Sequence, residues 1–272
     1  MENSSLKVLA INSLPANGNA GLKMVLGVLG TYVIPVPTLL LSGIGSIPGH
    51  ERYAVPFEAL LKGSLALAKR SGQSLIVYVG YLGNAQQAGV ILENLDGFRD
   101  IIRFVVVDPV CGDNGRAYVP EELIASWHPL LLRADLALPN LTEVALLSGA
   151  RGALALTQPE EYLSAFRQKY PALECIVTGV TEGNRVSNQW FRADHRQVFA
   201  HPHHPSYFSG AGDTYASLLL FFFFFKGLPK EQAILKAGLA VEMLIRYSVH
   251  LGSPDLLIHS EFRENLNALA DA

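Results

Sequence analysis

The chain has 272 residues, of which 50% are hydrophobic and 17% are charged. Its formal net charge of −3 gives no general electrostatic reason to bind nucleic acid or an anionic membrane, so any phosphate site must be local. This length and composition suit one α/β domain that spans residues 1–272.

Short β-branched runs alternate with longer amphipathic runs through most of the chain. We expect strands at Val8–Ile11, Val33–Pro37, Leu75–Val79, Phe104–Asp108, Leu136–Leu138 and Cys175–Thr178. We expect helices at about 20–31, 56–71, 84–99, 120–133, 141–148 and 158–169. This alternation predicts a three-layer αβα fold, in which helices cover both faces of a mainly parallel sheet.

The last third of the chain departs from this alternation. Two short alternating runs between Val186 and Ala200 predict a hairpin at a sheet edge, around Ala193-Asp194-His195. Helices are expected at 213–225 and 230–247, followed by an apolar run and a polar last helix. The phenylalanines Phe221–Phe225 would surround the first of these helices with aromatic rings. We expect that helix to be buried within the subunit or to take part in a subunit contact.

The segment Ser209-Gly210-Ala211-Gly212-Asp213-Thr214 carries the clearest chemical signal. Its glycines allow a tight turn that brings backbone N–H groups to the start of a helix, where a phosphate is attracted. A carboxylate at the same place would repel a phosphate, so we expect Asp213 to handle a proton beside it. The alternative interpretation is an ordinary glycine-rich turn, in which Asp213 caps the helix.

Three other expected strands are followed by polar residues. Asp108 and Asp113 lie in one glycine-rich loop, where paired acids could hold Mg²⁺ through water. Asn140 and Glu143 could form a capping box or direct a second acid at the metal, and Thr178 offers a hydroxyl to phosphate oxygens. Each of these could also be a simple turn. Ligands of parallel sheets bind beyond the carboxyl ends of the strands, so these residues should lie together.

As an ordered set, these motifs resemble the ribokinase-like superfamily. The set is Asp-Pro-Val-x-Gly-Asp at 108–113, Pro-Asn-x-x-Glu at 139–143, Val-Thr-Gly at 177–179 and Gly-Ala-Gly-Asp at 210–213. Within that superfamily the chain is most similar to the pyridoxal kinases, which the block from Asp108 to Gly149 follows almost continuously. The resemblance extends from about Val8 to about Ile258 and implies a ribokinase-like fold and a small-molecule kinase.

The resemblance implies roles for the glycine-rich turn. Asp213 is expected to be the base that deprotonates the 5′-hydroxymethyl group of a B6 vitamer. The backbone amides of Gly210, Ala211 and Gly212 would form the anion hole for the migrating phosphoryl group.

The resemblance also implies binding residues. Near the acceptor, Ser13 matches a serine that contacts the pyridine ring, Tyr81 matches an aromatic residue of the vitamer pocket, and Gly18 and Gly21 match glycines of the N-terminal loop. The residues expected around the ATP phosphates are Asp108, Asp113, Asn140, Glu143 and Thr178. Of these, Asp108 and Glu143 would hold Mg²⁺. The family's use of Mg-ATP, frequent need for K⁺ and usual homodimer are implied as well.

Two departures from the family pattern concern the acceptor. The family commonly has Ser-Asn followed by polar residues where this chain has Ser42-Gly43-Ile44-Gly45. Many members also have a threonine at the position of Leu138. A pocket with fewer polar partners could prefer one vitamer or accept hydroxymethylpyrimidine. The alternatives are therefore a hydroxymethylpyrimidine kinase and a non-catalytic vitamer-binding protein. Asp213 argues against both, because pyrimidine kinases typically carry cysteine there and a binding protein needs no base.

Other signals do not change this interpretation. The histidines near 201–204 lack a neighbouring cysteine or acid at zinc-ligand spacing, and Gly27–Gly30 falls in or at the end of a helix, which argues against a dinucleotide fingerprint. Cys111 and Cys175 are too few for a disulfide framework, and the chain does not start with the basic-then-apolar layout of a signal peptide. We expect a cytoplasmic protein, and a buried Cys111 without a nucleophilic role.

Overall fold

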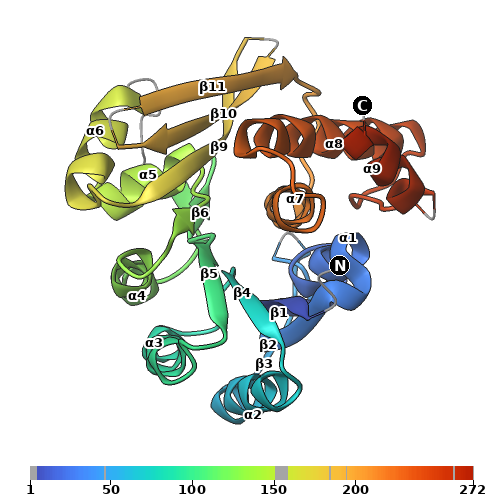
Figure 1. Cartoon of the computed structure of the whole chain (residues 1–272). Coiled ribbons are helices and arrows are strands. Elements are labelled where there is room, and N and C mark those ends of the chain that lie inside the picture. The colour runs from blue at the N-terminus through green and yellow to red at the C-terminus, as the bar shows by residue number, and fades with distance from the viewer. Residues whose placement is uncertain are drawn as a thin grey trace.

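The computed structural model describes residues 5–45, 47–150, 159–183, 185–193, 195–259 and 261–271. Nine of the described strands form one sheet, in the order β11-β10-β9-β8-β5-β4-β1-β2-β3 (Figure 1). These strands are β1 (Leu6–Asn17), β2 (Val33–Gly43), β3 (Arg52–Tyr53), β4 (Ser74–Val79), β5 (Ile102–Val107), β8 (Leu136–Ala137), β9 (Glu174–Glu182), β10 (Arg185–Arg192) and β11 (His195–Pro202). The six strands from β9 to β2 are parallel, which confirms the expected sheet.

Helices cover both faces of this sheet, as the alternating pattern predicted (Figure 1). One face carries α2 (Phe57–Arg70), α3 (Gln86–Gly97), α4 (Glu121–Leu131), α5 (Leu141–Ser148) and α6 (Pro159–Lys169). The other face carries α1 (Leu22–Leu29), α7 (Ala211–Leu220), α8 (Lys230–His250) and α9 (Phe262–Asp271). Each layer of helices shares an apolar core with its face of the sheet, because successive strand residues point to opposite faces. The fold is the three-layer αβα arrangement that the alternating pattern predicted.

The register of the central strands determines which residues meet at the carboxyl edge. Ile11 of β1 pairs with Val79 of β4, which in turn pairs with Val107 of β5. The residues that follow these three positions therefore lie side by side at one edge of the sheet. Asp108 is one of them, and the expectation that strand ends bring distant residues together is met here.

Three strands, β1, β2 and β9, run further than their sequences suggested. The Asn-Ser pair after Ile11 predicted the end of the first strand, but β1 continues to Asn17 and pairs with β2 as far as Gly43. Polar residues can lie inside a strand when their hydrogen bonds are satisfied, and Asn12 and Ser13 are both buried here. Ser13 is thus a strand residue rather than part of the loop that follows.

The strand around Thr178 also continues past its expected end. β9 runs on to Glu182, and its register with β10 shifts between Ser187 and Gln189, opposite the Thr178 region. Gly179 has a positive φ of 67°, which suits an irregular strand position of this kind. The expected edge hairpin is confirmed by the antiparallel pair β10–β11, although Asp194 of its turn lies outside the described residues.

The phenylalanine run is less deeply buried than a fully covered helix would be. α7 is followed directly by one turn of π-helix, Phe221–Phe225, in which only Phe222 is fully buried. The other four rings are partly exposed, and Phe225 stacks on Tyr32 with 4.2 Å between ring centroids. A π-turn changes the angular spacing of the rings, so one residue points inward while its neighbours lie near the surface. Among the described residues, no helix combines the length and apolar character required to cross a membrane.

A partly buried ion pair joins the first residue of α8 to the first residue of β9. Lys230 Nζ lies 2.5 Å from Glu174 Oε1, and the two side chains are only 17% and 16% exposed. The same carboxylate accepts a hydrogen bond of 2.6 Å from Trp190 Nε1, and the ammonium also lies 5.3 Å from the centroid of the Phe223 ring. These contacts link three segments that are far apart in the sequence.

Lys230→Met is expected to lower the free energy of unfolding by about 1–3 kcal/mol, because methionine keeps the packing but leaves a poorly hydrated carboxylate without its cation. Equilibrium urea denaturation measures this change. Lys69→Met is the matched control, since Lys69 pairs with Asp100 at the surface with both side chains about half exposed. That variant should change stability by less than about 0.5 kcal/mol. Equal effects of the two substitutions would contradict the prediction.

Candidate active site

The N-terminus of α7 brings the backbone amides of Gly210, Ala211 and Gly212 to the carboxyl edge of the sheet, where that of Ala211 donates a long hydrogen bond of 3.4 Å to the backbone oxygen of Phe208. Gly210 caps the helix with φ 81°, a left-handed conformation, and a Cβ on it would lie 2.4 Å from the backbone oxygen of Asn19. Only glycine allows this close approach between the turn and the loop after β1. The next residues, Ala211 and Gly212, begin the helix, and Gly212 is exposed. The positive end of the helix dipole and these amides can receive an anion.

Asp213 lies in the first turn of α7, and its carboxylate is held from two sides. Its Oδ1 accepts a hydrogen bond of 2.7 Å from Asn12 Nδ2, and its Oδ2 accepts one of 2.7 Å from the backbone N–H of Gly21. Burial raises the pKa of Asp213, while these two donors act in the opposite direction. A carboxylate with a raised pKa and a fixed orientation is suited to accept a proton.

Asp108 lies beside Asp213, and a tyrosine hydroxyl connects the two. Tyr78 Oη is 3.2 Å from Asp108 Oδ2 and 3.4 Å from Asp213 Oδ1, and the Tyr78 ring is fully buried in β4. Burial and, to a lesser degree, the negative charge of Asp213 raise the pKa of Asp108 well above its usual range. Two carboxylates that share one hydroxyl donor leave negative charge that a cation would neutralise.

Glu143 and Asn140 form the capping box that their spacing allowed. Asn140 Oδ1 accepts a hydrogen bond from Glu143 N, and Glu143 Oε2 accepts one from Asn140 N. The other carboxylate oxygen of Glu143 accepts a hydrogen bond of 3.1 Å from Cys111 N, so Glu143 also fixes the Asp108 loop. Glu143 is 2% exposed, and burial followed by the charge of Asp108 raises its pKa well above the usual range. Its expected contact with a metal stays a prediction.

Asp113 and Thr178 lie on either side of the Asn140 cap. Asp113 is in the small hairpin of β6 (Gly112–Asp113) and β7 (Arg116–Ala117), and Asn140 Nδ2 donates 2.9 Å to the backbone oxygen of Gly112. Thr178 pairs with Asn140 as an isolated parallel bridge. The Asp108 loop, the Asn140 cap and Thr178 are thus neighbours in space, although their roles toward a nucleotide stay predictions.

Ser13 and Tyr81 meet at one side chain, that of Asn12. Asn12 Oδ1 accepts hydrogen bonds from the backbone N–H of Ser13 at 2.8 Å and of Tyr81 at 3.0 Å. Tyr81 is also held at its hydroxyl, which accepts a hydrogen bond of 2.8 Å from Arg52 Nη1. The sequence analysis did not select Asn12, Tyr78 or Arg52. For Asn12 a signal was present, because it directly follows the expected first strand.

The segment 42–45 contributes an apolar wall. Ile44 is 8% exposed and packs on Gly18, where an added Cβ would lie 2.7 Å from Ile44 Cγ1. The backbone N–H of Ile44 donates to the oxygen of Asn17, so this packing is fixed by the end of β1. Neither Gly43 nor Ile44 has a side-chain polar atom, in line with the expected loss of polar partners here.

Two residues that could be mistaken for reactive groups are buried. Burial raises the pKa of the Cys111 thiol far above its usual value, so the thiolate is disfavoured and a structural role fits. His201 is 7% exposed, its ring nitrogen Nδ1 lies 3.1 Å from the backbone oxygen of Pro202, and burial lowers its pKa.

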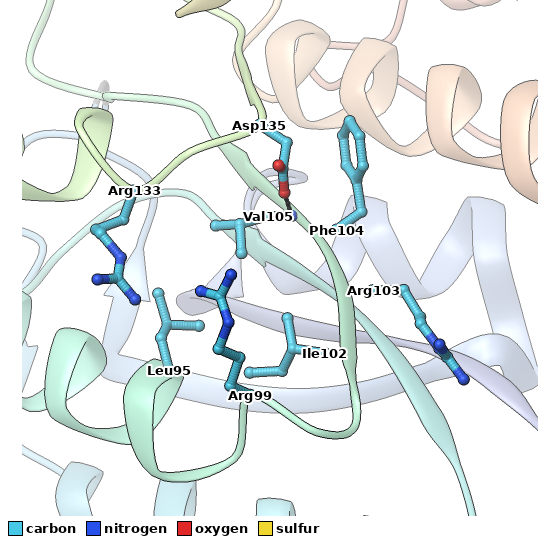
Figure 2. Close-up of a pocket in the computed structure, with 8 residues that line it drawn as sticks. All are labelled: Leu95, Arg99, Ile102, Arg103, Phe104, Val105, Arg133 and Asp135. Atoms are coloured by element: carbon cyan, nitrogen blue, oxygen red, sulfur yellow. Dashed lines mark hydrogen bonds between the residues drawn. The ribbon is translucent and has the colours of Figure 1, made fainter.

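A pocket of about 190 Å³ lies at the opposite edge of the sheet (Figure 2). It opens at the amino end of β5, and Arg99, Arg103, Arg133 and Asp135 are among its lining residues. The figure shows the side chain of Arg103 directed away from those of Arg99 and Arg133. None of the residues expected at the active site lines this pocket. It therefore lies apart from the candidate site, which follows the carboxyl ends of the strands.

Comparison with known proteins identifies the family of the chain. The model of the phosphomethylpyrimidine kinase family matches residues 58–259. A Schizosaccharomyces pombe protein named as a pyridoxal kinase is 30% identical over 80% of this chain and 74% of its own length. This chain belongs to the pyridoxal kinase family. Among solved structures of that family, pyridoxal kinase from Lactobacillus plantarum is 26% identical, with a TM-score of 0.79 over 98% of this chain and 97% of its own.

A second solved structure links the two family names. A Bacteroides thetaiotaomicron protein named as a phosphomethylpyrimidine kinase was crystallised with pyridoxal. It is 25% identical to this chain, with a TM-score of 0.81 over 97% of this chain and 96% of its own. Proteins that carry the phosphomethylpyrimidine kinase name and proteins that carry the pyridoxal kinase name therefore share one fold.

Proposed function

We propose that this pyridoxal kinase family member transfers the γ-phosphoryl group of ATP to the 5′-hydroxymethyl group of a B6 vitamer. The observation that carries the proposal is the orientation of Asp213 by Asn12 and Gly21, in the first turn of α7. A fixed carboxylate next to an anion-binding helix start is the pair of groups that a direct phosphoryl transfer to an alcohol requires.

In this proposal the proton and the phosphoryl group move in one direct step. Asp213 accepts the proton of the vitamer hydroxyl as its oxygen forms a bond to the γ-phosphorus. The bond between that phosphorus and the β,γ-bridging oxygen breaks, and ADP leaves. The amides of Gly210, Ala211 and Gly212 face the equatorial oxygens of the migrating group, where charge accumulates. No covalent enzyme intermediate is needed.

The nucleotide would lie along the Asn140 cap. The residues proposed at its phosphates are Asp108, Asp113, Asn140, Glu143 and Thr178. Asp108 fits a cation, because its carboxylate is buried beside that of Asp213 and, within the described part of the chain, takes a side-chain hydrogen bond from the Tyr78 hydroxyl alone. Mg²⁺ keeps several water ligands and needs few protein carboxylates, so one or two acids at this edge could hold it. Asp108, with Glu143 acting through water, would hold Mg²⁺, which neutralises phosphate charge when bound.

The acceptor ring would lie between the Tyr81 ring and Ser13, with Ile44 as an apolar wall. One observation favours the second candidate, a hydroxymethylpyrimidine kinase: this wall offers no side-chain hydrogen bond to the substituents that distinguish pyridoxal. A non-catalytic vitamer-binding protein is the third candidate, and the hydrogen bonds that orient Asp213 argue against it.

Phosphate transfer is tested by incubating the protein with Mg-ATP and one acceptor at a time. The acceptors are pyridoxal, pyridoxine, pyridoxamine and hydroxymethylpyrimidine, and the 5′-phosphate product is separated and quantified. We expect at least one vitamer to be phosphorylated with a higher kcat/KM than the pyrimidine. Preference for the pyrimidine would favour the second candidate. Vitamer binding by calorimetry without turnover would favour the third.

Four further properties are part of the proposal. The first is that residues 1–272 form a single domain. The second is a homodimer, which sedimentation equilibrium would test. The third is a cytoplasmic location, for which the buried free thiols of Cys111 and Cys175 are suited. The fourth is activation by K⁺, which replacing K⁺ with Na⁺ in the assay would test.

A further inference from the structure

We propose that Asn12 is the positioning residue that couples acceptor binding to the base. The proposal rests on the proposed function, and it adds that one buried side chain sets the distance between the acceptor contacts and Asp213. Asn12 is 1% exposed, and its amide touches Ser13, Tyr81 and Asp213. Ser13 and Tyr81 are expected at the ring of the acceptor, and Asp213 is expected at its hydroxymethyl group.

The hydrogen bonds of Asn12 determine which way its amide faces. Its oxygen accepts from two backbone N–H groups, those of Ser13 and Tyr81, and its nitrogen donates to Asp213. The flipped amide would place its NH₂ against two donors and its oxygen against a carboxylate. Each of those contacts is repulsive, so the orientation is determined by chemistry and not only by shape.

Packing holds Asn12 at this position. A Cβ on Gly80 would lie 2.3 Å from Asn12 Nδ2, so only glycine leaves room for the amide there. On the other side, Gly21 donates its backbone N–H to Asp213, and a Cβ on Gly21 would lie 2.3 Å from the backbone oxygen of Ser13. The amide therefore has little freedom to move away from the carboxylate.

This arrangement fixes the base relative to the acceptor. Asp213 Oδ1 accepts a hydrogen bond from the side chain of Asn12 and lies near the Tyr78 hydroxyl, and Oδ2 accepts one from the backbone N–H of Gly21. The carboxylate cannot turn without losing two hydrogen bonds. Because the same amide holds the backbone of Tyr81, a shift of the acceptor pocket is transmitted to the base through a single side chain. A misplacement of about 1 Å at such a site can lower the rate about 100-fold.

Asn12→Asp is the sharpest test of this proposal. The two side chains have the same shape, so aspartate can still accept from Ser13 and Tyr81, but it sets a second carboxylate against Asp213. We expect kcat for the preferred acceptor to fall about 100-fold while the KM for ATP changes less than twofold. The acid limb of the pH–kcat profile should move to higher pH, because a like charge raises the pKa of the base.

The matched control is Asn267→Asp, which makes the same amide-to-carboxylate change on α9. Asn267 is exposed and lies on an element that contributes nothing to the candidate site. Its kcat and its pH profile should stay those of the unaltered protein. If folded Asn12→Asp, judged by circular dichroism and thermal unfolding, keeps kcat within twofold and an unchanged acid limb, the proposal is overturned.

A second variant gives a readout that does not need turnover. Asn12→Ala removes the donor without adding charge, so the pKa of Asp213 should rise by about one unit. Carbon-13 NMR of the aspartate carboxyl groups, with the Asp213 signal assigned by its loss in Asp213→Asn, measures this. An unchanged Asp213 pKa would overturn the coupling even in a protein without kinase activity. Lack of turnover in the unaltered protein would overturn only the proposed function.

Discussion

Asp213→Asn is expected to lower kcat by about 10²–10⁴-fold, the range that a general base contributes. Asparagine has the same shape but cannot take up the hydroxyl proton at neutral pH. The nucleotide contacts proposed for Asp108 and Asn140 do not involve this side chain, so the dissociation constant of ATP should change less than about twofold. Steady-state phosphorylation assays and calorimetric ATP binding measure the two quantities. An unchanged turnover number would remove Asp213 from the chemistry.

The activity of the unaltered protein should depend on pH through the protonation of Asp213. Asp213 acts only when deprotonated, and burial raises its pKa above the ordinary aspartate value. Activity should therefore fall as the pH drops through this raised pKa, at a higher pH than an exposed aspartate would give. The acid limb should be absent from the residual activity of Asp213→Asn. Asp100→Asn is the control, because Asp100 is exposed and pairs with Lys69 at the surface, away from the candidate site, and it should leave the limb in place.

Gly210→Ala is expected to have the second large effect, on both stability and turnover. Alanine at φ 81° is strained, and its Cβ would lie 2.4 Å from the oxygen of Asn19 and 2.9 Å from Cα of Ala20. Both are backbone atoms, so the loop after β1 or the start of α7 must move. We expect a loss of about 1–3 kcal/mol in the free energy of unfolding. The displaced amides should also lower kcat by at least about 100-fold.

Gly212→Ala is the matched control for stability. The atom nearest to a Cβ on Gly212 is Asp108 Oδ2 at 3.9 Å, an ordinary van der Waals contact. Its free energy of unfolding should stay within about 0.5 kcal/mol or rise slightly, since alanine favours a helix. Urea denaturation of both variants separates the strain at Gly210 from a general effect of alanine in this turn. Equal stability of the two variants would contradict the close approach described here.

The sheet and its helices could be anticipated because their signals are local. Period-two and period-3.6 patterns of apolar residues depend on neighbours in the sequence, and they placed the parallel strands and most helices correctly. The strand ends were predicted wrongly where residues far away in the sequence determine how far a strand continues. β1 continues through Asn12 and Ser13 because β2 pairs with it and distant groups satisfy Asn12, whose amide donates to Asp213 and accepts from the backbone N–H of Tyr81. β9 continues past Thr178 because the hairpin that follows extends the pairing.

Some residues of the candidate site could likewise be identified from the sequence, and others could not. Asp108, Asp213 and the Asn140 cap could be identified from sequence, because each belongs to a short motif with its own backbone geometry. Asn12 was marked only by its place after the first expected strand and Tyr78 not at all, since their importance comes from contacts with Asp213 across 201 and 135 residues of chain. The sequence alone therefore determined which groups are available and the local turns that display them. Only the tertiary structure decided their partners, because strand register and helix packing bring distant side chains within hydrogen-bonding distance.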